Sequence, residues 1–172
     1  GRCEIIFPIV LFLSLVSRDS YKIMIRILHT ADWHLGQIFF GYDRAGEHEV
    51  FLNWLAGEIR EREIDALIIA GDVFDVSNPS AASQSLYYHF IYRVTAENPT
   101  LQIVIVAGNH DSAARLEAPL PLLQAMRTEV RGVVRKSDDG EIDYDHLTVE
   151  LKNRDGEVEL LCMAVPFLRQ GD

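Results

Sequence analysis

Three short clusters of polar side chains along the chain are of the types that bind metal ions. They are Asp32-Trp33-His34, Gly71-Asp72 with Asp75, and Asn109-His110-Asp111. Carboxylate oxygens, an amide oxygen and imidazole nitrogens suit divalent manganese, iron or zinc, and the clusters hold no cysteine that would favour a softer ion. One carboxylate, for which Asp72 is the candidate, can bridge two ions about 3.5–4 Å apart that activate water and neutralise a phosphoryl group. The residue types therefore predict a two-metal centre for hydrolysis at phosphorus.

Each cluster taken alone has a structural explanation, since turns and helix caps use such polar sequences routinely. The three clusters together, each directly after an apolar run, favour the metal centre over three unrelated turns. We expect Asp111 to fix its loop rather than bind an ion, and Trp33 to form a wall of the site. Among the other histidines we expect packing for His29, and surface or helix-face positions for His48, His89 and His146.

The elements that must position these clusters alternate between strands and helices. Apolar runs that predict strands occur at residues 25–28, 66–70 and 103–107. Helical patterns follow them at about residues 45–62, 79–96 and 116–127. This β-α-β-α-β-α order predicts an α/β fold with a mainly parallel sheet and helices outside. Since ligands of such sheets bind beyond the carboxyl ends of the strands, we expect the three clusters to converge there.

Two further stretches carry weaker predictions. The first helical stretch is expected to bury one face at helical spacing, made of Val50, Phe51, Trp54, Leu55 and Ile59. Arg44, just before it, is expected to be a solvated loop residue, with a phosphate contact as the alternative. In the last third, turn sequences separate apolar runs and predict antiparallel hairpins of a second sheet, with strands at residues 133–134, 147–151 and 158–165.

The charge of the chain argues against a protein that holds nucleic acid by its own electrostatics. Lys and Arg total 16 against 26 Asp and Glu, a net charge of -10 over 172 residues, whereas phosphate binding normally shows as a basic surface. Any action on nucleic acid must then rest on metal cations, a local basic patch or a basic partner. The length suits one domain. Cys3 and Cys162 form no metal-spaced pair, which indicates a reducing, cytoplasmic compartment.

The first residues differ from the rest. Residues 5–16 form an apolar run shorter than the roughly 20 residues that span a bilayer, so no membrane span is predicted. Met24 opens the first strand and is the predicted natural start. We therefore expect residues 1–23 to be an extension outside the native domain and residues 24–172 to form the domain. A targeting segment or a real additional element stays open as the alternative.

The pattern Asp-x-His, Gly-Asp-x-x-Asp and Gly-Asn-His-Asp resembles the calcineurin-like metallophosphoesterase superfamily. Within it, residues 29–36, 71–75 and 166–168 resemble SbcD-type nuclease subunits, and the resemblance extends from Met24 to the end of the chain. It implies a four-layer α-β-β-α sandwich. By position in the motifs, Asp32 and His34 would hold a first metal, and Asp72 would bridge the two ions.

The third motif supplies the remaining implied roles. Asn109 would bind the second metal through its side-chain oxygen, and His110 would assist the leaving oxygen as an acid or transition-state stabiliser. Asp75 occupies the position that orients this histidine in related phosphatases. The two ions would be divalent, with Mn2+ the expected metal.

The resemblance also implies a function and partners. It describes a DNA nuclease subunit, with double-strand exonuclease and single-strand or hairpin endonuclease activity, that works with an SbcC-type ATPase in DNA repair, recombination and replication. A homodimer within a heterotetramer is the family expectation. Two alternatives remain: another metallophosphoesterase, such as a nucleotide or cyclic-nucleotide phosphodiesterase, or an inactive remnant.

The chain departs from the family pattern in one respect. A later lone histidine and a Gly-His-x-His motif complete the family's two coordination spheres, and neither occurs before Asp172. We therefore expect a partial, C-terminally truncated domain. Such a chain would bind metal weakly and cut DNA weakly or not at all.

Overall fold

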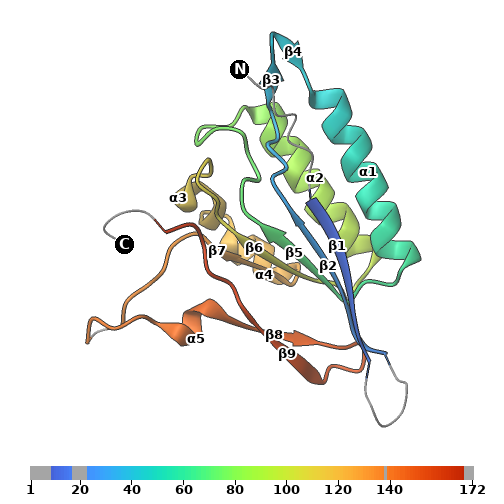
Figure 1. The fold of residues 1–172 in the computed structure, drawn as a ribbon, viewed down its shortest axis with the longest axis vertical. Helices are drawn as coiled ribbons and strands as arrows, with labels where there is room; N and C mark the ends of the chain where they lie inside the picture. Colours follow the sequence, from blue (N-terminus) through green and yellow to red (C-terminus); the bar gives the residue numbers. More distant parts are fainter. Residues whose placement is uncertain (1–8, 17–22, 138, 169–172) are drawn as a thin grey trace.

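Four parallel strands form the centre of the molecule (Figure 1), and the computed structural model describes residues 9–16, 23–137 and 139–168. In order across the sheet the strands are β2 (Ile23–Ala31), β5 (Ala66–Ala70), β6 (Gln102–Val106) and β7 (Thr128–Arg131). Each strand pairs in parallel with its neighbours, as Leu67 does with Leu28 and Ile103. The predicted α/β class with a parallel sheet is confirmed.

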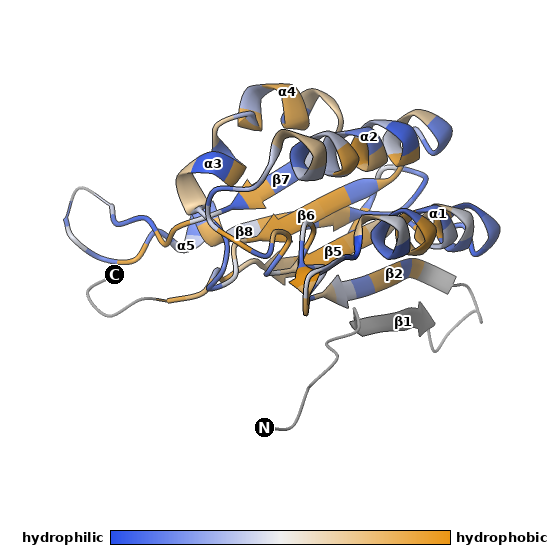
Figure 2. Ribbon diagram, turned by 90° about the horizontal axis from the view of Figure 1, so that it is seen from above, coloured by the Kyte–Doolittle hydropathy of each residue, from blue (hydrophilic) through white to orange (hydrophobic). Residues whose placement is uncertain are grey.

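Helices cover one face of this sheet. They are α1 (Ala45–Glu61), α2 (Ala81–Glu97), α3 (Ala113–Glu117) and α4 (Leu120–Ala125). Each new parallel strand is added on the same side of the previous one, and such crossovers are right-handed. All the connecting helices therefore fall on the same face, where Figure 2 shows α1 and α2 over the hydrophobic strands β5 and β6.

The edge beside β2 is formed by β1 (Ile9–Val16), which pairs antiparallel with β2 from Ile9↔Ala31 to Val16↔Ile23. Residues 1–8 and 17–22 of the predicted N-terminal extension lie outside the described residues, as does Cys3. The domain boundary at Met24 stays a prediction. Within the described part of the chain, no helix has the length and apolar character needed to cross a membrane.

Two predictions about local structure were wrong. The strand expected at residues 133–134 is β7 instead, which ends at Arg131. The single helix expected at residues 116–127 is the short pair α3 and α4. Pro119 stands between them as the N-cap of α4, and proline interrupts a helix because it has no backbone N–H to donate to the preceding turn.

The buried face of α1 also differs from its prediction. Its buried positions follow the i, i+4, i+7, i+8 spacing that points one stripe at the core, and they are His48, Leu52, Leu55, Ala56 and Ile59. Val50 and Trp54 lie off this stripe and are 71% and 45% exposed. The apolar character of these two side chains misled the prediction, and a polar residue, His48, takes the place in the stripe.

The opposite face of the sheet packs against a second, two-stranded sheet. β8 (Thr148–Lys152) and β9 (Val158–Met163) form an antiparallel hairpin. Val149, Leu151 and Ala164 share a buried cluster with Ile27 and Val104 of the central sheet. Helices, central sheet and second sheet are thus three of the four expected layers. In the described part of the chain, the only other helix is the single turn α5 (Tyr144–Leu147).

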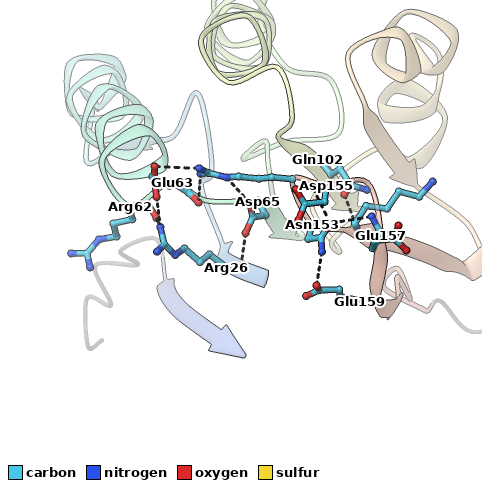
Figure 3. Close-up of polar contacts among 11 residues, drawn as sticks. Arg26, Arg62, Glu63, Asp65, Gln102, Asn153, Asp155, Glu157 and Glu159 are labelled. Atoms are coloured by element: carbon cyan, nitrogen blue, oxygen red, sulfur yellow. Dashed lines mark hydrogen bonds and ion pairs between the residues drawn. The ribbon is translucent and has the colours of Figure 1, made fainter. Parts of the chain in front are cut away.

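A polar clasp joins the two sheets at the amino ends of the parallel strands (Figure 3). We define the clasp as Arg26, Glu63, Asp65, Gln102 and Arg154. Arg154, in the β8–β9 turn, donates from Nε to Asp65 Oδ1 at 3.1 Å and from a terminal nitrogen to the Glu63 carbonyl at 2.8 Å. Gln102 accepts from the Lys152 backbone N–H at 2.7 Å and donates to the Glu150 carbonyl at 3.0 Å.

Between β2 and α1 the chain forms a small hairpin of β3 (Ile38–Phe39) and β4 (Tyr42–Asp43). Its two turn residues, Phe40 and Gly41, both have positive φ, +49° and +83°, as expected of the tight turns that match the twist of paired strands. The hairpin therefore begins just after the first polar cluster and ends just before α1.

Candidate metal centre

The first two polar clusters are joined by backbone hydrogen bonds that continue the β2–β5 pairing beyond the strands. The N–H of His34 donates to the Asp72 carbonyl at 2.9 Å, and that of Leu35 to the Val73 carbonyl at 2.9 Å. The N–H of Asp32 reaches the Gly71 carbonyl at 3.2 Å. The carboxyl ends of β2 and β5 are thus held together, as the predicted parallel sheet requires.

Three of the candidate ligands have a left-handed backbone, with φ of +57° at Asp32, +46° at His34 and +49° at Asp72. This conformation is uncommon for residues other than glycine and costs on the order of 1–3 kcal/mol each when strained. Such strain persists only where the surroundings enforce it, and it clusters at functional sites. Here the three residues stand where the chain leaves β2 and β5, and both carboxylates lie within 4 Å of the His34 imidazole.

The imidazole of His34 lies between two carboxylates. Its Nε2 is 3.9 Å from Asp32 Oδ1 and 3.8 Å from Asp72 Oδ2, too far for hydrogen bonds. Two ligands bound at about 2.1 Å to one ion stand roughly 3.0–3.4 Å apart, so the distances from His34 to the two carboxylates are slightly longer than those between ligands of one ion. Asp32 does not belong to the group of ligand atoms that lie within 4.8 Å of one another. His34 and Asp72 are both buried. This donor set fits a divalent metal.

Asp75 contacts both histidines of the centre, through different atoms. Its carboxylate Oδ1 lies 3.4 Å from His34 Nδ1, a buried nitrogen with no hydrogen-bond partner within normal geometry. Its main-chain carbonyl lies 2.7 Å from His110 Nδ1. The predicted neighbourhood of Asp75 and His110 is present, yet the carboxylate faces His34. A carboxylate on the far nitrogen of a metal-binding histidine fixes its tautomer and orientation.

The third cluster closes the centre from the end of β6. The His110 N–H donates to Asp72 Oδ1 at 3.0 Å, and the rings of His34 and His110 meet edge to face at 4.9 Å. One ligand atom from each of His34, Asp72 and His110 can be chosen so that all lie within 4.8 Å of one another. Asn109 is exposed in the same loop. The structure thus brings the clusters together, and the metal and catalytic roles stay predictions.

Protonation of His110 is favoured by its surroundings. The hydrogen bond to the Asp75 carbonyl raises the pKa of His110 above its ordinary value, and the nearby carboxylates of Asp72, Asp75 and Asp111 add to this effect. A histidine that keeps its proton can donate it to a leaving oxygen, which suits the role of general acid.

Asp111 holds the loops in place. Its buried carboxylate accepts hydrogen bonds from the backbone N–H groups of Val73 at 3.2 Å, Phe74 at 3.0 Å and Gly108 at 2.9 Å. Burial raises the pKa of Asp111, and these hydrogen bonds oppose that rise. The contacts agree with the predicted role of fixing the loop, and they tie together two different loops.

Gly108 allows these loops to touch. A Cβ at Gly108 would lie 2.0 Å from Asp72 Oδ1 and 2.3 Å from the Asp72 nitrogen. Gly71, with a φ of +89°, faces Gly108 so closely that a Cβ there would come within 3.0 Å of its Cα. The second and third clusters can therefore meet only because both positions lack side chains.

Several residues lie elsewhere than predicted. Trp33 is 1% exposed and donates from Nε1 to Thr30 Oγ1, so it belongs to the core rather than to a wall of the site. Of the histidines expected at the surface or on a helix face, His48 is buried on the inner face of α1, while His89 is exposed and His146 half-buried. Arg44 is 8% exposed, not a solvated loop residue. Sequence reasoning did not single out Gln37, which contacts Asp75.

Comparison with known proteins places the fold and motifs among described families. The family model for calcineurin-like phosphoesterases matches residues 25–162. Two curated proteins, each named as the D component of the nuclease SbcCD, align over 147 residues, or 86% of this chain. The one from Rhodobacter capsulatus is 44% identical with 36% of its length covered, and the one from Escherichia coli K12 is 37% identical with 34% covered. The chain thus spans about a third of these relatives.

Two further matches are shorter or weaker. A Bacillus subtilis protein with the same name is 42% identical over 97 residues, 56% of this chain and 25% of that protein. Among solved structures, the crystal structure of Pseudomonas putida nuclease MPE has a TM-score of 0.42 and 17% identity. That match covers 74% of this chain and 63% of that one, and the likeness is too low to bear on function.

Proposed function

This chain belongs to the calcineurin-like phosphoesterase family, and we propose from that premise that it acts in metal-dependent hydrolysis of phosphodiester bonds in DNA. The family implies divalent metal ions and hydrolysis at phosphorus. The choice of DNA is supported by the name of the relatives that are 44% and 37% identical, which describes a component of the nuclease SbcCD. The family match at residues 25–162 contains all three polar clusters.

One observation carries the proposal. His34 Nε2 faces Asp32 and Asp72 at 3.9 and 3.8 Å, with carboxylates from two loops converging on one imidazole nitrogen. These three side chains stand on backbone with positive φ and make no hydrogen bond with one another. A shared cation would explain the convergence, because it would satisfy both carboxylates and the nitrogen at once.

The remaining residues fit the chemistry. Asp32 and His34 would hold one ion, Asp72 would bridge, and Asn109 would contribute to a second; we propose Mn2+ as the metal and two as the number. Bound divalent ions supply an activated water and neutralise charge on the phosphoryl group. His110, whose pKa the hydrogen bond to the Asp75 carbonyl raises, would give a proton to the leaving oxygen. Asp111 would hold the loops that carry these groups.

The charge of the chain bears on its partners. A net charge of -10 gives the chain little attraction for DNA beyond its metal ions. A basic surface outside the described residues would add that attraction, and we propose that an SbcC-type ATPase, joined to a homodimer of this protein as a heterotetramer, contributes it. The proposed compartment is the cytoplasm.

Metal binding tests the proposal most directly. Titration of the chain with Mn2+, followed by calorimetry and by the Mn2+ electron paramagnetic resonance signal, should show binding that Asp72→Asn weakens by about tenfold or more. Asp145→Asn, an exposed carboxylate on α5, is the matched control and should leave the affinity unchanged. Equal affinity in all three proteins would contradict the proposed site.

Substrate choice needs a second experiment. The protein with Mn2+ is offered a linear DNA duplex and a small chromogenic phosphodiester, each with and without His110→Ala. Cleavage of the duplex that depends on His110 would support the nuclease. Hydrolysis of the small diester alone would favour the nucleotide-phosphodiesterase alternative.

A further inference from the structure

We propose that Gln37 and Arg44 are positioning residues that hold the His34 imidazole in place through the Asp75 carboxylate. Gln37 Nε2 donates to Asp75 Oδ1 at 3.3 Å, the same oxygen that lies 3.4 Å from His34 Nδ1. Arg44 donates from a terminal nitrogen to Gln37 Oε1 at 2.5 Å. Two hydrogen bonds thus connect the start of α1 to Asp75, and the Asp75 carboxylate approaches the candidate metal ligand His34 at 3.4 Å, outside normal hydrogen-bond geometry.

The directions of the two hydrogen bonds made by Gln37 follow from the chemistry of its partners. A guanidinium can only donate, so Gln37 must present its oxygen to Arg44. Its amide nitrogen then faces Asp75, where it can only donate. A carboxylate only accepts, so the Asp75 oxygen 3.4 Å from His34 Nδ1 favours the tautomer that carries its proton on Nδ1. That tautomer leaves the lone pair on Nε2, the nitrogen that faces Asp32 and Asp72.

Arg44, the residue of this series farthest from His34, is itself held in place. Arg44 is 8% exposed, and its Nε donates to Glu47 Oε2 at 2.7 Å, in the first turn of α1. Its backbone N–H donates to the Gln37 carbonyl at 3.3 Å. Gln37 and Arg44 therefore stand at the two feet of the β3–β4 hairpin and are tied by both main chain and side chain. An arginine held this way acts within the fold rather than as a contact for a DNA phosphate.

The consequence concerns the preorganisation of His34. Cutting the chain of contacts at Gln37 frees the Asp75 carboxylate to turn toward solvent, and the His34 ring loses the partner that selects its tautomer. Because this inference rests on the proposed metal site, its test needs one readout that requires metal and one that does not. The first is Mn2+ affinity, and the second is the tautomer of His34 in metal-free protein, read from its ring nitrogen chemical shifts.

The test compares Gln37→Met with Gln124→Met, the same substitution at an exposed position on α4. Gln37→Met should weaken Mn2+ binding by about tenfold, as loss of an outer partner of a metal ligand does, and should shift the neutral His34 ring from the Nδ1–H toward the Nε2–H form. Gln124→Met should change neither. Melting temperatures of both variants without metal should stay close to that of the parent, which separates positioning from folding.

Arg44 supplies an independent second arm. Arg44→Met should weaken Mn2+ binding by about threefold, since Gln37 remains but can rotate, and Arg44→Lys should recover part of the loss because an ammonium still donates to Oε1. An unchanged tautomer and affinity in Gln37→Met would overturn the inference. If the parent chain shows no Mn2+ binding, the proposed function fails, and the tautomer shift alone decides whether the positioning contacts act as described.

Discussion

The two ends of the central sheet gather acidic side chains in opposite ways. At the amino ends, Glu63 and Asp65 of the clasp have guanidinium partners in Arg26 and Arg154. At the carboxyl ends, the carboxylates of Asp32, Asp72 and Asp75 all face one imidazole, that of His34, at 3.4–3.9 Å. The same strands thus separate a charge-compensated end from an end where carboxylates converge.

The difference has a physical reason. Carboxylates that approach one another repel, so a fold keeps them together only where a cation offsets the repulsion. At the clasp the cation is part of the chain, and hydrogen bonds from Arg154 and then Arg26 lower the pKa of Glu63. At the carboxyl ends the fold tolerates backbone strain at Asp32, His34 and Asp72 to keep the acids close. The clasp serves stability, and the carboxyl ends suit a ligand.

The largest expected effect comes from forcing the converging end apart. In Gly108→Ala, the new methyl group would overlap Asp72 Oδ1 and the Asp72 backbone nitrogen, at 2.0 and 2.3 Å. Because the obstacle includes backbone, we expect a loss of about 3 kcal/mol in unfolding free energy, as in severe overpacking, and no measurable Mn2+ binding. Urea denaturation and Mn2+ titration measure the two effects.

Gly57→Ala is the matched control for that substitution. Gly57 lies within α1, where nothing stands within 4 Å of an added Cβ. Since alanine is the better helix former, Gly57→Ala should stabilise the chain by about 0.5–1 kcal/mol. A Gly108→Ala protein as stable as the parent would show that the second and third clusters are not packed as described.

The carboxyl ends of the central strands are easier to predict from sequence than the sheet edge, because their strands have a stronger apolar pattern. The strands that carry the site are buried on both faces, so they appear as continuous apolar runs; residues 66–70 are predicted as a strand and form β5. The ligand clusters follow such runs directly. β7 (Thr128–Arg131), at the sheet edge, alternates polar residues with Val130 and gives too weak a signal, so the predicted strand fell at residues 133–134.

Tertiary partners account for what sequence could not supply. Arg44 and His48 belong to types that are mostly exposed or only intermediate in burial, yet both are buried. Gln37 gives no periodic signal, and its importance comes from Arg44 across the hairpin and Asp75 from the next loop. The clasp joins Arg154 to Asp65 over 89 residues. Pairings of this kind depend on register and loop geometry, which a single sequence does not display.

Asp32→Asn tests whether the converging carboxylates repel. It should stabilise the metal-free protein, by less than Gly108→Ala destabilises it. In Asp32→Asn, one negative charge is removed while a residue that tolerates positive φ is kept. Without metal, the variant should be more stable than the parent by about 0.5–1 kcal/mol, a typical gain when a functional site is neutralised. With Mn2+, the order should reverse, because the parent gains binding energy that the variant lacks. Thermal unfolding with and without Mn2+ would show the crossing.

The decisive result is that Mn2+ reverses which protein, the parent or Asp32→Asn, is the more stable. If Asp32→Asn lowered stability in metal-free protein, the carboxyl ends would resemble the clasp, with each acid supporting the fold. Asp145→Asn serves as the control, since Asp145 is exposed on α5, and its stability should respond to Mn2+ as that of the parent does.

The last prediction concerns the clasp, where Arg154→Ala removes the guanidinium that joins the two sheets. Arg154 is half-exposed, so its pair with the buried Asp65 should contribute only about 0.5–1 kcal/mol near neutral pH. Because the pKa of Glu63 is lowered from 4.5, the carboxylate's stabilising contribution is present above that value and is lost as the pH falls through the folded-state pKa. The stability gap between parent and variant should therefore narrow below pH 4.5.

Urea denaturation at pH 7 and at about pH 3 measures the difference in unfolding free energy between the parent and Arg154→Ala. High salt at pH 7 should also narrow this difference, since salt screens exposed ion pairs. Arg60→Ala removes an arginine whose nearest carboxylates are 3.8 and 4.0 Å away, and it should show almost no gap at either pH. A gap for Arg154→Ala that survives acid and salt would mean that Arg154 holds the second sheet by packing and by its bond to the Glu63 carbonyl. The clasp would then stabilise the fold without charge, and only the carboxyl ends of the sheet would depend on electrostatics.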